Sequence, residues 1–138
     1  MSRDISFYIV DILIASDKIK RYTQKFNNAT TFLHSELEWD ATIRELEIIG
    51  EATNKLLQAN ILDPKYRMIV DFRNQIIHGY FGIDETIVWE VATSLLNDFI
   101  TTIQHIVDEN AIDLQNAIAC AKEDHHYNPS TMAFLERL

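Results

Sequence analysis

The chain has 138 residues, the length of one ordinary domain, and 47% of them are hydrophobic, so it can bury a core without metal or disulfide support. Its net charge of −9 argues against a general nucleic-acid binder, which would show a basic stripe. One cysteine, Cys120, excludes an internal disulfide. The chain opens without a leader-like segment and has no apolar run of membrane-spanning length, so we expect a soluble cytoplasmic protein that does not enter membranes.

Long helices are predicted, because the whole chain contains only three Gly and two Pro to interrupt them. Apolar residues at alternating steps of three and four predict a first helix over residues 4–26. We expect Phe32 and Leu33 to lie on a short turn. A second helix is expected to start at Ser35, with Ser35 and Glu38 forming a capping box.

Two further helices are predicted before residue 110. Gly50 lies in the middle of the second helix, where glycine costs up to ~1 kcal/mol relative to Ala, so we expect another helix to approach closely there. A third helix is predicted over residues 64–79 with Asp63 as its cap, because proline favours the first helical position. Asp84 is expected to cap a fourth helix that reaches Glu109. Short connections between these helices predict an antiparallel bundle.

The helical pattern weakens after residue 110. A fifth amphipathic helix is expected around residues 114–121, and Ser130 could cap a last helical turn. The sequence therefore predicts an all-α fold, an antiparallel helical bundle of four to five helices. We divide it into a helical domain of residues 1–110 and a C-terminal helical extension of residues 111–138, which the core is not expected to need.

The segment from Asp71 to Gly82 contains the residues that best suit chemistry. On a helix, Asn74 and His78 share a face, whereas Arg73 and His78 lie about 140° apart. One helix would not readily point Arg73 and His78 at the same phosphate, but two copies meeting across a two-fold axis could do so. Tyr80, seven residues after Arg73, would share its line if the helix continued past Gly79.

These side chains suit RNA cleavage, in which a 2′-hydroxyl attacks the adjacent phosphate and no metal is needed. A histidine can take or give the proton near neutral pH, and a guanidinium offers a fixed charge to the developing phosphorane. The sequence has no Gly-rich phosphate loop and no metal-site spacing, so we expect no cofactor and no metal. From spacing alone, however, an Arg, an Asn and a His on a helix are more often ordinary surface or interface residues.

Several separated blocks resemble the HepT proteins, the DUF86 branch of the HEPN superfamily. The similarity covers the chain from its N-terminus to about Asp108. It is carried by the Arg-x4-His-x-Tyr pattern at residues 73–80, by the second-helix block Arg44-Glu45-Leu46-Glu47-Ile48-Ile49-Gly50-Glu51-Ala52, by residues 80–84 and 87–91, and by residues 3–4 and 8–13.

The resemblance implies a HEPN fold, a symmetric homodimer or higher homo-oligomer, and a metal-independent endoribonuclease with a composite active site at the dimer interface. By position it implies a catalytic set of Arg73, Asn74 and His78, in which Asn74 is the polar residue after the motif arginine. It also implies the toxin of a type VII-like HepT/MntA toxin–antitoxin system. An MntA-type nucleotidyltransferase antitoxin would silence it by transferring AMP to the motif tyrosine, here Tyr80. RNA is the implied substrate, with tRNA the candidate.

A second hypothesis remains open at the sequence level. The chain could be a non-catalytic helical binding or regulatory subunit of a nucleotidyltransferase pair. The acidic charge favours this alternative slightly, whereas the intact set of Arg73, Asn74, His78 and Tyr80 favours the ribonuclease. Cleavage of RNA by the purified protein in EDTA would discriminate between the two.

Overall fold

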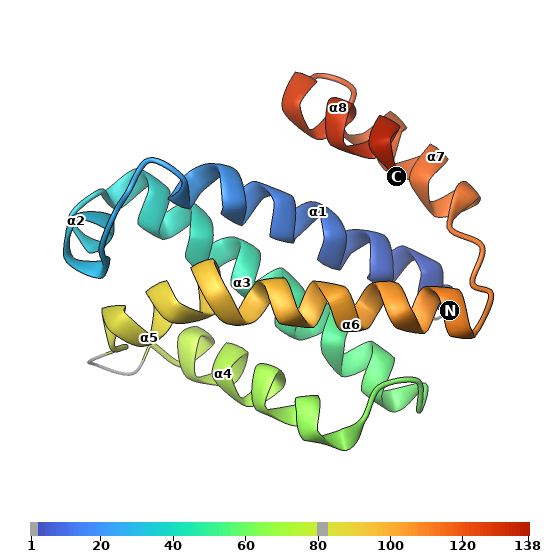
Figure 1. Ribbon diagram of the computed structural model, residues 1–138, viewed down its shortest axis with the longest axis horizontal. Helices are drawn as coiled ribbons and strands as arrows, with labels where there is room; N and C mark the ends of the chain where they lie inside the picture. The colour runs from blue at the N-terminus through green and yellow to red at the C-terminus, as the bar shows by residue number, and fades with distance from the viewer. Residues whose placement is uncertain (1–2, 80–82) are drawn as a thin grey trace.

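The computed structural model describes residues 3–79 and 83–138, and every regular element within them is helical, which confirms the all-α prediction. Figure 1 shows α1 and α3 lying against each other, with α6 across them, α4 along one side and the α7–α8 pair on the opposite side. The elements in chain order are α1 (Ile5–Thr23), α2 (Ala29–Leu33), α3 (Glu36–Gln58), η1 (Pro64–Tyr66), α4 (Arg67–Ile77), α5 (Glu85–Glu90), η2 (Val91–Leu95), α6 (Leu96–Glu109), α7 (Gln115–Asp124) and α8 (Pro129–Arg137).

The core is built from the apolar stripes that the sequence predicts. Fully buried side chains of α1, α3 and α6 meet at its centre, including Ile12, Leu56 and Ile103. Two of the expected helix starts are confirmed, since the Asp63 carboxylate accepts from the Lys65 amide and the Asp84 carboxylate from the Thr86 amide. Each cap satisfies a backbone N–H that has no partner within its helix.

The entry to α3 differs from its prediction in two ways. Phe32 and Leu33 lie on the short helix α2, not on a turn, and the Asn28 side chain caps that helix by accepting from the Thr31 amide at 2.9 Å. Ser35 makes no side-chain bond to the backbone of α3, so the predicted capping box is wrong. Its hydroxyl instead donates to the Glu38 carboxylate.

The predicted third and fourth helices are both less regular than expected. The third begins with the 3-10 turn η1 and ends at Ile77, two residues early, because Gly79 adopts a φ of +58° that stops a right-handed helix. The predicted break at Gly82 lies outside the described residues. The fourth helix is continuous from residue 85 to 109 but contains one turn of π-helix, η2, at its middle.

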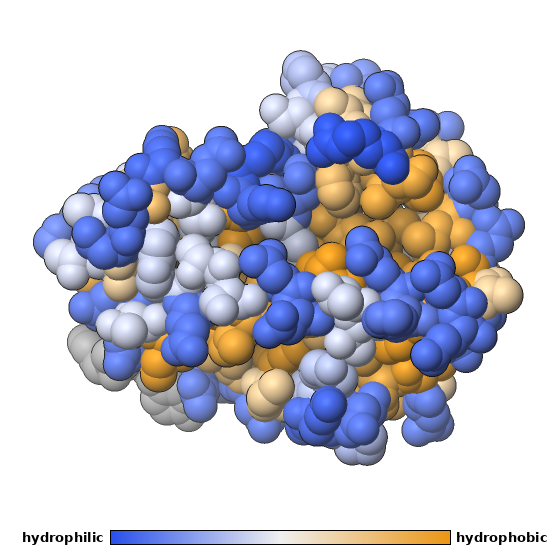
Figure 2. All heavy atoms as spheres, in the orientation of Figure 1, coloured by the Kyte–Doolittle hydropathy of each residue, from blue (hydrophilic) through white to orange (hydrophobic). Residues whose placement is uncertain are grey.

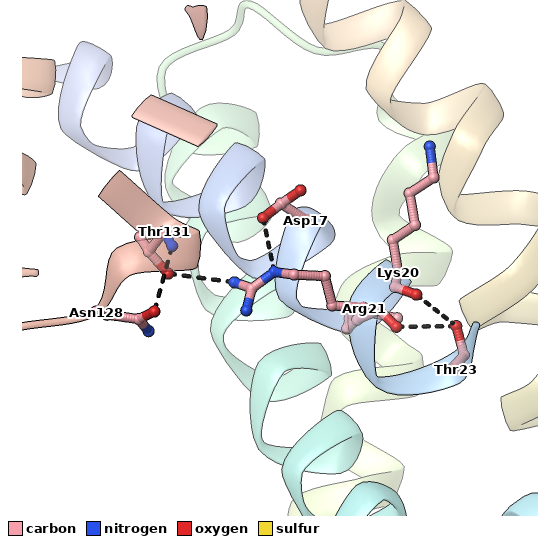
Figure 3. Close-up of polar contacts among 7 residues, drawn as sticks. Asp17, Lys20, Arg21, Thr23, Asn128 and Thr131 are labelled. Carbon is pink, nitrogen blue, oxygen red and sulfur yellow. Dashed lines mark hydrogen bonds and ion pairs between the residues drawn. The ribbon is translucent and has the colours of Figure 1, made fainter. Parts of the chain in front are cut away.

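The extension forms two helices that lie along α1. Its apolar side chains pack on Val10 and Ile14, and Leu114 and Phe134 also pack against the main core. Asn128, not Ser130, caps α8, and Figure 3 shows how this end is tied to α1: Arg21 pairs with Asp17 at 3.0 Å and donates to the buried Thr131 hydroxyl at 3.2 Å. The extension is therefore packed on the bundle, not detached from it.

A wide hollow separates the extension from α6, and its apolar lining is visible in Figure 2. It has a volume of about 620 Å³, and its walls include Leu13, Trp89 and Phe134. Among the helices of residues 3–79 and 83–138, none combines the length and the apolarity needed to span a membrane.

Candidate functional site

Gly50 of α3 makes room for Arg73 of α4. A β-carbon placed on Gly50 would lie 2.2 Å from the Arg73 Cβ and 2.5 Å from its Cγ, distances at which atoms overlap. The expected close helix approach at Gly50 is thus confirmed, and the approaching residue is the candidate catalytic arginine. Glycine at this position lets the stem of Arg73 lie directly against the backbone of α3.

The Arg73 guanidinium is held at both of its terminal nitrogens. One donates to Asn74 Oδ1 at 3.0 Å and the other to Glu51 Oε2 at 3.0 Å. The Arg73 side chain is 27% exposed, and its Nε is buried with no hydrogen-bond partner within the described residues. A planar cation fixed in this way is suited to meet an anion that arrives from solvent, because little further ordering is needed.

His78 lies at the C-terminal end of α4, where its backbone N–H donates to the Asn74 carbonyl at 3.1 Å and its side chain is exposed. The structure therefore brings Asn74 to Arg73 through side chains and to His78 through the backbone. Arg73 faces α3, whereas His78 is exposed at the C-terminal end of α4. Tyr80 was expected to share the line of Arg73 only if the helix continued past Gly79, but α4 ends at Ile77. Tyr80 itself lies outside the described residues.

A hollow of about 440 Å³ opens beside Arg73, between the start of α1, one face of α3, and α4. Its lining residues are Arg3, Tyr8, Asp11, Arg44, Glu47, Ile48, Glu51, Ala52, Lys55, Arg73 and Ile77. Four of the 12 Lys and Arg residues of the chain are in this set, against three carboxylates. The hollow thus carries a formal charge of +1 in a chain whose net charge is −9.

Each arginine of the hollow is paired with a carboxylate. Arg3 meets Asp11 at 2.8 Å and Arg44 meets Glu47 at 3.6 Å, in addition to the Arg73–Glu51 pair. In the parts of the chain that the structure describes, no three His, Cys, Asp or Glu side chains are grouped closely enough to hold a metal ion. The cationic groups that line the hollow are the guanidinium groups of Arg3, Arg44 and Arg73 and the ammonium group of Lys55.

A buried carboxyl lies on α3 next to the hollow. Burial raises the pKa of Glu45 above its ordinary value of 4.5. The positive charges of Lys18, Arg44 and Arg21 lower it by a smaller amount. Glu45 is not among the residues that line the hollow, so its effect falls on the contact between α3 and α1.

Comparison with known proteins identifies the family of the chain. The family model "Ribonuclease HepT-like" matches residues 12–106, which include Gly50, Glu51, Arg73 and His78. The chain belongs to the HepT-like ribonuclease family of helical HEPN proteins. No solved structure matches it.

Three relatives show the extent of the similarity. "Probable ribonuclease HepT" of Thermococcus cleftensis is 33% identical over 93 residues, 65% of this chain and 84% of the relative. "Putative RNase MJ1380" of Methanocaldococcus jannaschii is 32% identical over 92 residues, 64% of this chain and 84% of the relative. "Putative RNase MJ0127" of the same organism is 32% identical over 123 residues, 80% of this chain and 98% of the relative.

Sequence reasoning gave no role to Glu51, nor to the cations of α3 that line the hollow. The signal was present in part, because Arg44, Glu51 and Lys55 are spaced by seven and four residues and so lie on one face of a helix. The partner of that face could not be deduced, since Glu51 and Arg73 are 22 residues apart in the chain.

Proposed function

We propose that this protein is an endoribonuclease that cleaves RNA by attack of a 2′-hydroxyl on the adjacent phosphate, without a metal ion. Membership of the HepT-like ribonuclease family supports an RNase, and one observation carries the assignment of the site: Arg73 is fixed by Gly50, Glu51 and Asn74 with its charge at the edge of an open hollow. Arg73 would stabilise the charge on the phosphorane, Asn74 would orient the guanidinium, and His78 would transfer the proton.

The active site is proposed to be shared between two subunits. Arg73 faces α3 and His78 is exposed at the end of α4, and a five-residue step turns about 140° around a helix, so a second copy could bring its own His78 to this Arg73. Exposed apolar side chains on α4 and on the following helices offer a surface for that copy, namely Met68, Ile77, Ile87 and Leu95, which are 62%, 43%, 49% and 49% exposed. Burying such side chains between two copies would stabilise a homodimer.

In the cell, this RNase is proposed to be the toxin of a HepT/MntA type VII-like toxin–antitoxin system. Its partner would be an MntA-type nucleotidyltransferase that transfers AMP to the Tyr80 hydroxyl. In the sequence Tyr80 follows His78 by two residues, so an added AMP would carry a phosphodiester charge close to the active site. RNA is the proposed substrate, with tRNA as its candidate class.

The test is cleavage of RNA by the purified protein in EDTA. Wild type should cleave and leave a 2′,3′-cyclic phosphate, because the 2′-oxygen forms a bond to phosphorus while the 5′-oxygen leaves. Arg73→Ala and His78→Ala should abolish cleavage while their helical circular dichroism stays unchanged. A wild-type protein that binds the nucleotidyltransferase but leaves RNA intact would instead favour the non-catalytic regulatory subunit.

A further inference from the structure

The hollow beside Arg73 contains more positive charge than the catalytic step uses. Arg73 lies at its α4 wall, and Arg3, Arg44 and Lys55 come from the start of α1 and from α3. We infer that this hollow binds the phosphodiester backbone of single-stranded RNA next to the scissile phosphate, with Arg44 and Lys55 as positioning residues. The inference rests on the proposed function, since it extends the same site.

The face of α3 that lines the hollow is long enough for more than one phosphate. Arg44 and Lys55 are 11 residues apart, so they are separated by about 16 Å at 1.5 Å per residue. That is several times the ~3.4 Å axial separation of successive phosphates along one stacked strand. Glu51 and its partner Arg73 lie between these two cations along the helix. A strand following α3 would therefore pass Arg73 between two further positive charges.

Of the paired arginines in the hollow, Arg44 can most easily exchange its carboxylate partner for a phosphate. The Arg44 side chain is 70% exposed and stands 3.6 Å from Glu47, a weak solvent-screened pair. Arg73, by contrast, is only 27% exposed and is held at two nitrogens. A phosphate, with its full negative charge, can replace Glu47 on Arg44 at little cost, whereas Arg73 stays in place. An exchangeable Arg44 beside a fixed Arg73 is expected if Arg44 positions the RNA strand and Arg73 acts on its scissile phosphate.

Aromatic and apolar groups beside the cations favour a single strand over a free anion. The Arg3 guanidinium lies 5.0 Å from the centre of the Tyr8 ring, and Tyr8 and Ile48 also line the hollow. Proteins that bind single-stranded nucleic acids combine a positively charged groove with aromatic side chains on which bases stack. The hollow has both kinds of group, whereas a plain phosphate site would need only the cations.

The experiment measures binding of a fluorescent, single-stranded 2′-O-methyl RNA by anisotropy over a series of salt concentrations, using the full-length protein. The methyl group removes the nucleophile, so the wild-type protein binds the probe without cleaving it. The variants are Arg44→Gln and Lys55→Gln, and Glu47→Gln, which releases Arg44 from its carboxylate. Lys20→Gln is the matched control, because it removes the same charge from the exposed surface of α1 at the other hollow.

If the inference is right, Arg44→Gln and Lys55→Gln each weaken binding several-fold and lower the slope of log K against log salt by about 0.7, the value for one phosphate contact in a single strand. Glu47→Gln binds more tightly than wild type, and Lys20→Gln matches wild type. The inference is overturned if Arg44→Gln and Lys55→Gln give the affinity and slope of Lys20→Gln.

Cleavage of unmodified RNA separates this inference from the proposed function. If both hold, Arg44→Gln and Lys55→Gln raise KM with little change in kcat, as expected for residues that position substrate. If wild type binds the probe with the predicted slopes but cleaves no RNA, the proposed function fails and the binding site stands. If wild type cleaves and both variants keep its KM, the RNase stands and the inference fails.

Discussion

Gly50 and Arg73 occupy adjoining space so closely that a single added carbon on Gly50 would overlap the stem of Arg73, at 2.2 Å from its Cβ. The glycine of α3 therefore determines where α4 carries its arginine. Glu51, the next residue along α3, then holds the guanidinium at 3.0 Å. Gly50 thus positions the aliphatic part of the Arg73 side chain, and the adjacent Glu51 positions its guanidinium.

Gly50→Ala should cost activity more than stability. Overpacking costs about 1–3 kcal/mol, and replacing a mid-helix glycine recovers up to ~1 kcal/mol, so the free energy of unfolding should fall by about 0–3 kcal/mol. Moving Arg73 by about 1 Å should lower RNase activity on the order of 10²-fold. Gln58→Ala, at the exposed end of α3, should leave both quantities unchanged. Full activity in Gly50→Ala would show that the position of Arg73 does not matter.

The extension should stabilise the bundle although the active site does not include it. Leu135→Ala in α8 should lower the free energy of unfolding by about 2–5 kcal/mol, because Leu135 is 1% exposed and packs with Val10 and Ile14. Leu138→Ala, where the side chain is 42% exposed, is the control and should change it by less than about 0.5 kcal/mol. Denaturant unfolding measures both.

Truncation after Asn110 tests the division of the chain at residue 110 directly. The shortened protein should keep its activity per folded molecule but melt at a lower temperature, since removing α7 and α8 uncovers Val10 and Ile14. Loss of activity in a truncated protein that is still folded by circular dichroism would make the extension part of the functional unit. If truncation prevents folding, Leu135→Ala gives the same comparison of activity with stability in the full chain.

Glu45 should make the folded protein less stable as pH rises. Burial raises the pKa of Glu45 above 4.5 in the folded protein, so between pH 4.5 and this higher pKa the folded state binds more protons than the unfolded state. Its contribution to stability is therefore lost as pH rises from 4.5 through the folded pKa. Glu45→Gln should melt at a higher temperature than wild type at pH 7, and the difference should shrink toward pH 4.

Glu123→Gln, on the exposed surface of α7, should change the melting temperature little across the same pH range. A Glu45→Gln variant that is less stable than wild type at pH 7 would mean that the attraction of Lys18, Arg44 and Arg21 outweighs burial.

Under the proposed toxin–antitoxin function, Tyr80 is the residue at which an MntA-type nucleotidyltransferase controls the RNase. Co-expression with the proposed nucleotidyltransferase should add one or more AMP units, which mass spectrometry should map to Tyr80 and which should accompany loss of RNase activity. The transfer joins the tyrosine oxygen to the α-phosphate of ATP and releases pyrophosphate. Tyr80→Phe should stay active and escape silencing. If Tyr80→Phe is still silenced by a catalytically competent partner, control works by occlusion or at another residue.

The sequence predicts most of the fold because local signals and tertiary packing agree over most of its length. The apolar stripes of α1 and α3, and the caps Asp63 and Asp84, identify helices that the structure contains. The wrong predictions concern helix caps, where several nearby side chains compete for the same backbone N–H groups. Asn28 and Asn128 take the capping roles that the sequence did not assign to them, and the Ser35 hydroxyl bonds to a side chain in place of the backbone.

The site is less predictable than the fold, because its decisive contacts join residues far apart in the chain. The choice of Gly50 as a point of close approach follows from the cost of a mid-helix glycine, but nothing in the sequence indicates that Arg73 is what approaches. The hollow likewise needs α1, α3 and α4 in register before Arg3 and Lys55 face the same space. Periodicity identifies the faces of single helices, and packing determines which faces meet.

A composite active site predicts that two inactive variants restore activity when they are mixed. Arg73→Ala and His78→Ala should each be folded and inactive in an RNA cleavage assay in EDTA. When they are combined under conditions in which subunits exchange, a hybrid dimer has one site that retains Arg73 from one subunit and His78 from the other. About half of the protein should then be hybrid by random pairing, and a measurable part of the wild-type activity should return. No recovery despite demonstrated exchange, by mass spectrometry of hybrid dimers, would contradict the shared site and place Arg73 and His78 in one subunit.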